Sequence, residues 1–258
     1  MVAPNKSLGQ HWLKDRVILE AIVDEAEISD SDTVLEIGPG LGTLTSVLLS
    51  RAKRVIAVEF DKDLAGKLSG QFPGKDLTVH NQDILSFDLS SLPPRYKVVA
   101  NVPYYITSKI VQLLSETSNP PSCSVLLVQK EVAERLAAAP GEMSLLSLSA
   151  QLFHEVSLGP LVPAEYFTPP PKVDSQVVVL YRRTTPLVPF DLQKAFFRLV
   201  KAGFSERRKK LRSALAGGLA LDKSDVDTML STAHISTEAR AQELTIDQWL
   251  QLLQVSQV

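Results

Sequence analysis

Residues 33–42 read TVLEIGPGLG, and this stretch decides the fold. A short apolar run, typical of a buried strand, is followed at once by three glycines spaced G-x-G-x-G. Residues 44–52 then carry apolar side chains at helical spacing, and residues 54–59 (RVIAVE) form a second apolar run. A strand, a glycine turn, a helix and a second strand in this order open a doubly wound α/β sheet.

The same alternation continues towards residue 182. The pattern predicts further strands at 77–80, 97–101, 124–129, 151–157 and 176–182, and helices at 62–70, 105–115 and 130–138. From Phe190 onward the strands stop, and helical patterns follow at 191–202, 206–216, 222–232 and 245–254, with Gly217-Gly218 between two of them. We therefore predict a Rossmann-like α/β domain over residues 1–185 and a small all-helical domain over residues 186–258.

The composition excludes several classes of protein. Over 258 residues the chain is 45% hydrophobic and 22% charged, which excludes disordered and collagen-like chains. The single cysteine, Cys123, cannot form an internal disulfide, which favours a reducing compartment and a cytoplasmic location. No apolar run approaches the roughly 20 residues that span a bilayer, and residues 1–15 are too polar for a signal peptide. We expect a protein without a membrane anchor.

The charge is unevenly distributed along the chain. The totals of 27 Lys+Arg and 29 Asp+Glu give a net charge of −2, which by itself argues weakly against a nucleic-acid partner. Residues 181–258, however, hold 12 basic and 8 acidic residues, a net charge of +4. The first 180 residues hold 15 basic and 21 acidic residues, a net charge of −6. The densest basic run lies between Lys201 and Arg212, and we expect Arg207, Arg208, Lys209 and Lys210 to contact RNA phosphates. A solvated helix surface is the alternative explanation.

Three acidic residues follow successive strands of the predicted sheet. Glu36 lies two residues before Gly38, Glu59 ends the next strand, and Asp83 follows the third. A carboxylate at the position of Glu59 accepts both hydroxyls of a ribose, and Asp83 is placed to bind an exocyclic amine of adenine. Glu36 would repel a pyrophosphate and favours a cationic ligand. These positions therefore indicate S-adenosylmethionine, although Asp83 alone is equally explained as a turn cap.

Residues 101–104 read NVPY and come directly after the predicted strand at 97–101. An exocyclic aromatic amine is a poor nucleophile, so an enzyme that alkylates it needs acceptors for the amine hydrogens. The side-chain oxygen of Asn101 and the carbonyl of Val102 offer two, and Tyr104 offers a ring on which an unstacked base can lie. An ordinary Asn-x-Pro turn at a strand end is the structural alternative.

These stretches together resemble the family of small-subunit (16S) ribosomal RNA adenine N6,N6-dimethyltransferases (KsgA/RsmA-like), which are class I methyltransferases. The resemblance covers nearly the whole chain and rests on several separate stretches in order. They are 6–13 (KSLGQHWL), 36–42 (EIGPGLG), 101–104 (NVPY), 129–135 (QKEVAER), 167–175 (FTPPPKVDS) and 204–211 (FSERRKKL). Two departures are visible: Val102 replaces the usual Leu of N-L-P-Y, and residues 143–148 (MSLLSL) lack the aromatic, Gly and Arg of the family's Y-G-R-L-S-V.

The resemblance implies a function and a set of site residues. The cofactor is S-adenosylmethionine, and its expected contacts are His11, Leu13, Gly38, Glu59, Asp83 and Asn101. Asn101 and Tyr104 are expected to be catalytic, with Phe167 as a second stacking partner for the target base. The reaction is dimethylation of N6 of adenine, at two adjacent adenosines of small-subunit ribosomal RNA during ribosome biogenesis, by a cytoplasmic monomer that needs no metal.

Three other functions remain open from the sequence. The first is methylation of an adenine in large-subunit RNA, which the 167–175 loop and the basic run disfavour. The second is a ribosome-assembly factor whose methylation activity is secondary. The third is a non-RNA adenine methyltransferase, which leaves the basic domain unexplained. His80, His154 and His234 show no metal-ligand spacing and are interpreted as structural or surface residues.

Overall fold

The computed structural model describes residues 10–206 and 208–256, and it divides into two compact units. The first unit combines the chain up to residue 134 with residues 154–182, and the second combines residues 135–153 with the chain from residue 183 onward. The predicted division at 185/186 did not anticipate that residues 135–153 pack with the helical end of the chain. The reason is apolar packing: Met143, Leu148 and Phe153 are buried in one cluster with the C-terminal helices.

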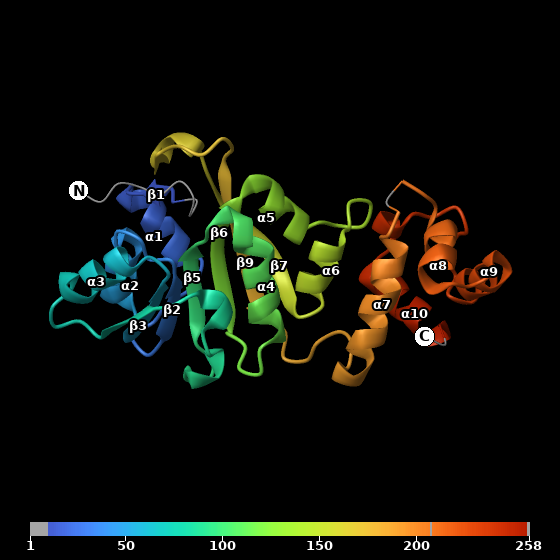
Figure 1. Cartoon of the computed structure of the whole chain (residues 1–258), viewed down its shortest axis with the longest axis horizontal. Helices are drawn as coiled ribbons and strands as arrows, with labels where there is room; N and C mark the ends of the chain where they lie inside the picture. Colours follow the sequence, from blue (N-terminus) through green and yellow to red (C-terminus); the bar gives the residue numbers. More distant parts are fainter. Residues whose placement is uncertain (1–9, 207, 257–258) are drawn as a thin grey trace. The chain divides into compact units, whose positions relative to one another are not determined.

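The first unit is built on a seven-stranded sheet in the order β4-β3-β2-β5-β6-β9-β7 (Figure 1). The strands are β2 (Thr33–Ile37), β3 (Arg54–Glu59), β4 (Leu77–Asn81), β5 (Lys97–Asn101), β6 (Cys123–Gln129), β7 (His154–Val162) and β9 (Ser175–Arg182). The first five strands of the order are parallel, and β9 is antiparallel to both β6 and β7. Because the order reverses direction between β2 and β5, a ligand crevice is expected at the carboxyl ends of these two strands.

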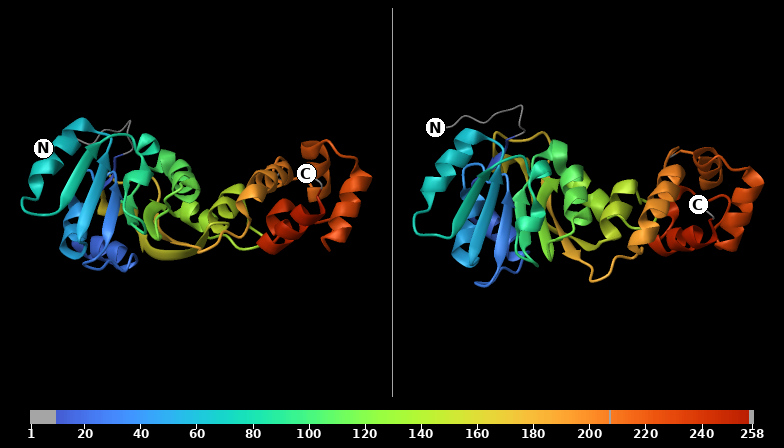
Figure 2. Two further views of the ribbon diagram at one scale, coloured as in Figure 1. Left: turned by 90° about the horizontal axis from the view of Figure 1, so that it is seen from below. Right: turned by 60° about the horizontal axis from the view of Figure 1, so that its bottom comes forward.

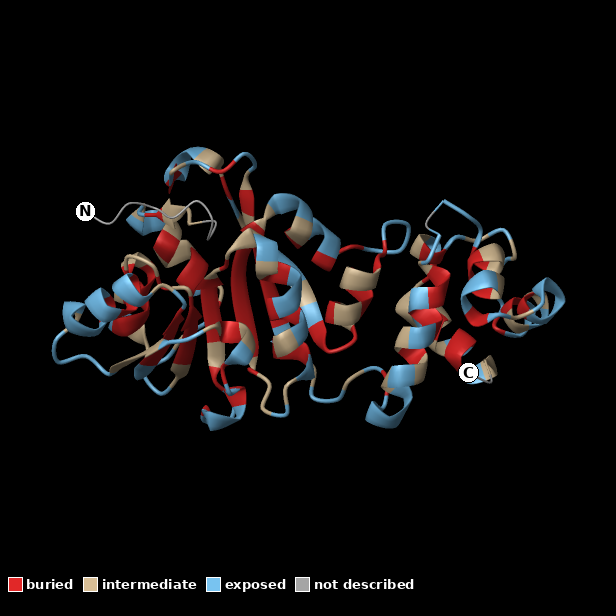
Figure 3. Ribbon diagram, in the orientation of Figure 1, coloured by how far each residue is buried: buried red, intermediate tan, exposed pale blue. Residues whose placement is uncertain are grey.

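Helices cover both faces of this sheet (Figure 2). They are α1 (Arg16–Asp24), α2 (Thr43–Arg51), α3 (Lys62–Gln71), α4 (Thr107–Glu116) and α5 (Lys130–Leu136). Alternate strand residues such as Val34, Val55 and Val99 are buried in one cluster with α1 and α2. The residues between them are buried too, so the central strands have almost no exposed surface (Figure 3). Burial on both faces explains why these strands read as continuous apolar runs in the sequence.

A second, two-stranded sheet ties the start of the described chain to the proline-rich loop. Strand β1 (Trp12–Leu13) pairs antiparallel with β8 (Phe167–Thr168), so that Trp12 faces Thr168 and Leu13 faces Phe167. The side chains of Leu13 and Phe167 are both 2% exposed and belong to the apolar cluster under α1 and α2. The two pairs join residues that are 156 and 154 positions apart in the sequence.

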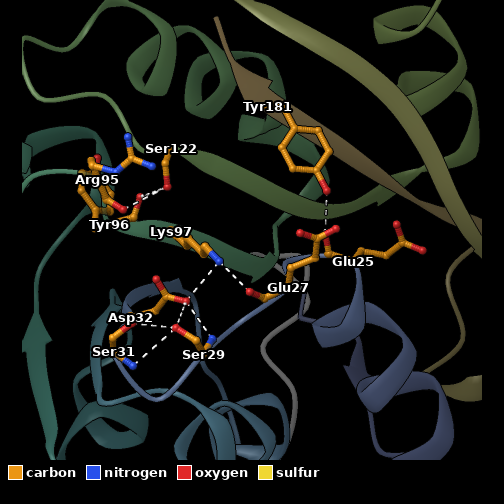
Figure 4. Close-up of polar contacts among 10 residues, drawn as sticks. All are labelled: Glu25, Glu27, Ser29, Ser31, Asp32, Arg95, Tyr96, Lys97, Ser122 and Tyr181. Atoms are coloured by element: carbon orange, nitrogen blue, oxygen red, sulfur yellow. Dashed lines mark hydrogen bonds and ion pairs between the residues drawn. The ribbon is translucent and has the colours of Figure 1, made fainter. Parts of the chain in front are cut away.

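Polar contacts fix the loops at the amino ends of the strands, at the opposite edge from the predicted crevice (Figure 4). The Lys97 ammonium lies 3.1 Å from the Asp32 carboxylate and donates a hydrogen bond to the Glu27 carbonyl at 2.7 Å. Partial burial opposes ionisation of Asp32, but hydrogen bonds from Ser29 and Lys97 outweigh it and lower the pKa of Asp32. This edge is therefore organised as a structural clamp between β2 and β5.

The second unit is helical. Its helices are α6 (Leu145–Gln151), α7 (Gln193–Gly203), α8 (Leu211–Leu219), α9 (Lys223–Thr232) and α10 (Ile246–Val255). Trp249 is completely buried at the centre, and its ring stacks on Phe204 with centroids 5.8 Å apart. A Cβ added at Gly203 would lie 2.5 Å from the Trp249 ring, so a glycine is required where α7 meets α10.

Three local predictions differ from the structure. Residues 145–151 form α6, and the strand predicted at 151–157 begins only at His154. The helix predicted at 206–216 begins only at Leu211, with Lys210 at its N-cap position, so most of the basic run lies before the helix. Gly217-Gly218, predicted to separate two helices, lies inside α8, which ends at Ala220 in the left-handed conformation (φ 56°).

Candidate functional site

A cavity of about 340 Å³ lies at the carboxyl ends of the parallel strands, where the strand order reverses. Side chains from β1, the glycine turn, the end of β3, the segment after β4 and the segment after β5 line it. Of the residues predicted from the sequence, those that line the cavity are His11, Leu13, Gly38, Glu59, Asp83, Asn101 and Tyr104. Segments from five separate parts of the chain thus meet at the position where a doubly wound sheet binds its ligands.

The glycine turn forms the floor of the cavity between β2 and α2. Gly38, Gly40 and Gly42 have φ angles of 66°, 56° and 78°, a left-handed conformation that side chains with a Cβ rarely adopt. A Cβ at Gly42 would also lie 2.7 Å from the Leu68 side chain. The G-x-G-x-G spacing is therefore a backbone requirement, and it brings the main chain close to the cavity at the start of α2.

Glu36 is the most unusual charged residue of the cavity. It is 1% exposed, and neither carboxylate oxygen makes a hydrogen bond of standard geometry with another described residue. Desolvation raises the pKa of Glu36 to about 8; the nearby Thr45 opposes this shift, and the charge of Glu59 adds to it. An unpartnered buried carboxylate is costly to ionise unless a cation arrives to compensate it. The cavity therefore offers a cation-binding carboxylate.

Glu59 and Asp83 are held at the cavity wall by backbone amides. The two carboxylate oxygens of Glu59 accept hydrogen bonds from the amides of Gly40 (3.0 Å) and Asp61 (2.8 Å). Burial raises the pKa of Glu59, although these hydrogen bonds oppose the shift. Asp83 caps the short helix that follows it, with one carboxylate oxygen accepting from the Leu85 amide at 2.9 Å. Asp83 therefore caps a turn and also lines the cavity, and its contact with adenine stays a prediction.

Asn101 ends β5 and is oriented by the chain at the start of the described residues. Its side-chain nitrogen donates a hydrogen bond to the His11 carbonyl at 3.1 Å. The amide oxygen of Asn101 is therefore the atom left to accept a hydrogen bond from a ligand. Because β1 is itself paired with β8, the position of Asn101 depends on the pairing of these two short strands.

Tyr104 is fixed on two sides. Its hydroxyl forms a 2.7 Å hydrogen bond with the buried Ser175 hydroxyl, and its ring stacks on the His11 ring with centroids 5.8 Å apart and an interplanar angle of 19°. The His11 ring is held in turn by a 2.7 Å contact between its Nδ1 and the Pro169 carbonyl. Burial raises the pKa of Tyr104, so the phenol stays neutral at physiological pH. The ring is thus a preorganised flat surface beside Asn101.

Comparison with known proteins identifies the chain. The sequence profile of the ribosomal RNA adenine dimethylase family matches residues 1–257. The chain belongs to this family. The resemblance noted in the sequence is confirmed, and so are the class I methyltransferase fold and the assignment as an enzyme.

Individual relatives agree with the family assignment. "Ribosomal RNA small subunit methyltransferase A" of Dehalococcoides mccartyi (strain CBDB1) is 40% identical over 251 residues, which are 96% of this chain and 86% of that protein. A solved dimethyladenosine transferase from Plasmodium falciparum superposes with a TM-score of 0.79 at 30% identity, covering 94% of this chain and 96% of that one. The solved 23S rRNA methyltransferase ErmE superposes with a TM-score of 0.78 at 28% identity, and the match covers 95% of this chain and 98% of that one.

Phe167 is placed differently from the other predicted site residues of this family member. It is 2% exposed, packs in the cluster that contains Leu13, and is not among the residues that line the cavity. In this structure Phe167 lies opposite Leu13 in the β1–β8 pair, and its ring is too deeply buried to stack on a base. Other residues that line the cavity were not predicted from the sequence, although they are close to the predicted motifs along the chain. They include Gln10, Thr43, Phe60, Gln82, Tyr105 and Lys109.

In the helical unit, three of the predicted RNA-binding residues lie between α7 and α8. Arg208, Lys209 and Lys210 are exposed, and Arg207 lies outside the described residues. The Lys209 ammonium is 2.6 Å from the Glu206 carboxylate, and Lys210 pairs with Glu238. Part of the positive charge of this turn is therefore compensated by neighbouring carboxylates.

The described residues were also examined for metal-ligand clusters and for membrane-spanning helices. Residues 10–206 and 208–256 contain no group of three or more His, Cys, Asp or Glu side chains that could hold a metal ion. Within the same residues, none of the helices combines the length and the apolar character that crossing a bilayer requires.

Proposed function

We propose that this protein transfers methyl groups from S-adenosylmethionine to N6 of adenine in small-subunit ribosomal RNA, two for each adenosine, at two adjacent adenosines during ribosome assembly. The observation that carries the proposal is the cavity itself. It brings a cation-binding carboxylate and two further acids together with the Asn101–Tyr104 segment, in a chain that belongs to the rRNA adenine dimethylase family. A cytoplasmic location and action as a monomer belong to the same proposal.

The residues of the cavity fit the cofactor. S-adenosylmethionine supplies, when bound, a methyl group on a positively charged sulfur, and it carries an amino group, a ribose and an adenine. The unpartnered Glu36 carboxylate compensates positive charge in a buried setting. Glu59 accepts hydrogen bonds from the ribose hydroxyls, and Asp83 uses its second carboxylate oxygen to accept from the adenine amine. Gly38, Leu13 and His11 supply close backbone and side-chain contacts along the wall.

Asn101 and Tyr104 carry the catalytic part of the proposal. The amide oxygen of Asn101 and the carbonyl of Val102 accept hydrogen bonds from the target amine and orient its lone pair towards the methyl group. Tyr104 stacks on the target base, which must leave its RNA stack to enter the cavity. No strong base is required, because the nitrogen becomes acidic as the new bond forms and releases its proton to water. Orientation of the two reactants supplies much of the rate.

The basic turn before α8 completes the proposal on the RNA side. Arg207, Arg208, Lys209 and Lys210 contact phosphates, and they position the RNA without reading its bases. For Lys209 and Lys210 this requires an exchange of the partners Glu206 and Glu238 for phosphate oxygens. Exposed ion pairs of this kind are worth little, so the exchange costs little.

The choice between small-subunit and large-subunit RNA rests on sequence relatives. The fold does not exclude large-subunit RNA, since the 23S rRNA methyltransferase ErmE superposes with a TM-score of 0.78. The relative that is 40% identical over nearly the whole chain is named for the small subunit, and this favours the small-subunit substrate.

The test is methyl transfer to purified ribosomal subunits from a strain without the modification. We expect the wild-type protein to form dimethyladenosine in small subunits, and not in large ones, and Asn101→Ala to lose at least about 100-fold in rate while it still binds subunits. Gln112→Ala, an exposed change on α4 outside the cavity lining, serves as the control. Methylation of large subunits alone, or of neither subunit, contradicts the proposal. Normal subunit assembly with Asn101→Ala supports the additional role of an assembly factor.

A further inference from the structure

We propose that Tyr105 and Lys109 form a platform at the mouth of the cavity that holds the nucleotide next to the target adenosine. This inference rests on the proposed function, because it assumes that an RNA strand enters the cavity. It assigns residues outside the predicted site, and it concerns how the substrate is retained rather than how the methyl group is transferred.

The two neighbouring tyrosines of the NVPYY segment have opposite environments. Tyr104 and Tyr105 lie in the same short helix, Tyr104–Ile106, and both line the cavity. The Tyr104 ring is fixed by Ser175 and His11, whereas Tyr105 is 64% exposed. Within the described part of the chain, no ring contact or hydrogen bond engages the Tyr105 side chain. One aromatic face is therefore held inside the cavity and the other is free at its rim.

Lys109 lies four residues after Tyr105, in the first turn of α4. Tyr105 belongs to the short helix that directly precedes α4, and both residues line the same cavity. Lys109 is exposed and lines the cavity, and no ion pair engages it among the described residues. The first turn of α4 contains no acidic residue, so the positive end of its helix dipole adds to the lysine charge. A phosphate beside a stacked base meets favourable charge here.

The surrounding charges indicate which way the strand leaves the cavity. A shallower hollow shares Leu85 and Lys109 with the cavity, but it is lined by the acidic residues Asp88 and Glu116. A phosphodiester chain is repelled along that path. The other strongly exposed aromatic of the cavity lining is Phe60, at 62%, which follows Glu59 on the side assigned to the cofactor. Tyr105 is thus the aromatic placed to meet RNA.

A stacked neighbour has a specific consequence for a reaction that transfers two methyl groups to one nitrogen. The monomethylated adenine must stay in the cavity, or return to it, for the second transfer. A base on Tyr105 and a phosphate on Lys109 hold the strand without contacting the reacting atoms. The platform therefore acts on RNA affinity and on the ratio of dimethylated to monomethylated product.

The experiment measures methylation of unmodified small subunits by wild type, Tyr105→Ala, Tyr105→Phe and Lys109→Ala. Nucleoside mass spectrometry reports the two products, and calorimetry reports cofactor binding separately. Stacking worth about 1–3 kcal/mol per base predicts roughly a tenfold higher KM for RNA with Tyr105→Ala and a larger monomethylated fraction. Tyr105→Phe keeps the ring and restores both values. Lys109→Ala lowers the slope of log affinity against log salt by about 1.

Two control variants remove an exposed tyrosine and an exposed lysine outside the cavity lining. Tyr166→Ala removes an exposed tyrosine (42%) away from the cavity lining, and Lys67→Ala removes an exposed lysine of α3. The platform is overturned if Tyr105→Ala matches Tyr166→Ala in KM and product ratio, if Tyr105→Phe is as impaired as Tyr105→Ala, or if the loss follows weaker cofactor binding. A wild-type protein that methylates no adenosine instead overturns the proposed function, and the inference falls with it.

Discussion

Replacing Glu36 by Gln should make the protein more stable and, at the same time, a poorer binder of its cofactor. Burial raises the pKa of Glu36 from 4.5 to about 8 in the folded chain. Between these two values the unfolded chain loses its proton while the folded chain keeps it, so wild-type stability falls as the pH rises through this window. Glutamine has no proton to lose and removes the penalty.

The size of the effect follows from the shift. Each pH unit in the window costs about 1.4 kcal/mol, so Glu36→Gln should gain on the order of 3 kcal/mol in unfolding free energy near pH 7. The gain should be below about 1 kcal/mol near pH 5 and should level off above about pH 8. Urea unfolding of the cofactor-free protein at these pH values measures it. Glu131→Gln, an exposed change on α5, should show no such pH dependence.

Cofactor binding should change in the opposite direction. A hydrogen bond to a charged group is worth about 1.5–3 kcal/mol, so Glu36→Gln should weaken S-adenosylmethionine binding by tenfold or more in calorimetry. Wild-type affinity should rise with pH towards about 8, as the carboxylate becomes easier to ionise. Equal affinity of the two proteins, or equal stability at all pH values, would refute the assignment of Glu36 as a buried cation-binding carboxylate.

Three further predictions concern packing, orientation and the sheet edge. Gly218→Ala should lower the unfolding free energy by about 1–3 kcal/mol, because the added Cβ would lie 2.7 Å from Ala202. Gly217→Ala, which has open space around it, should raise the unfolding free energy by about 0.5–1 kcal/mol, and thermal melts compare the two variants. Ser175→Ala removes the hydroxyl that fixes Tyr104, for which we propose a catalytic role, and should lower kcat about tenfold, with Ser175→Thr restoring part of it; unchanged kcat would exclude this role. Lys97→Gln should destabilise the protein near neutral pH by about 1 kcal/mol, and the difference should vanish as acid protonates the Asp32 carboxylate, whose pKa in the folded chain lies below the ordinary value of an aspartate.

The alternation of strands and helices, and the edge of the sheet at which the candidate site lies, could be predicted from the sequence. Buried parallel strands are apolar on both faces, so they appear as continuous runs such as residues 54–59. The glycine turn requires positive φ angles at three positions, and only glycine adopts them readily, so the spacing was readable without coordinates. The acids and the NVPY segment follow strand ends directly, and parallel strands place such residues at one edge.

Which of these residues lie close together in space depends on long-range contacts that the sequence pattern does not show. The pairing of β1 with β8 brings Leu13 against Phe167, and this long-range contact buries the ring that the sequence assigned to base stacking. The position of the basic run before α8, and the continuation of α8 through Gly218, depend on packing against α7. The exposure of Tyr105 beside the half-buried Tyr104 is likewise invisible in the sequence.

The physical reason is the range of the interactions involved. Apolar periodicity and glycine φ angles act between residues a few positions apart, so they leave a pattern in the chain. The hydrogen bond from the Asn101 amide to the His11 carbonyl and the Tyr104–Ser175 hydrogen bond join segments far apart in the sequence, and the burial of Glu36 requires several strands and helices to be in place. Their energies depend on desolvation and on distances of about 3 Å, which arise only when the whole sheet has formed.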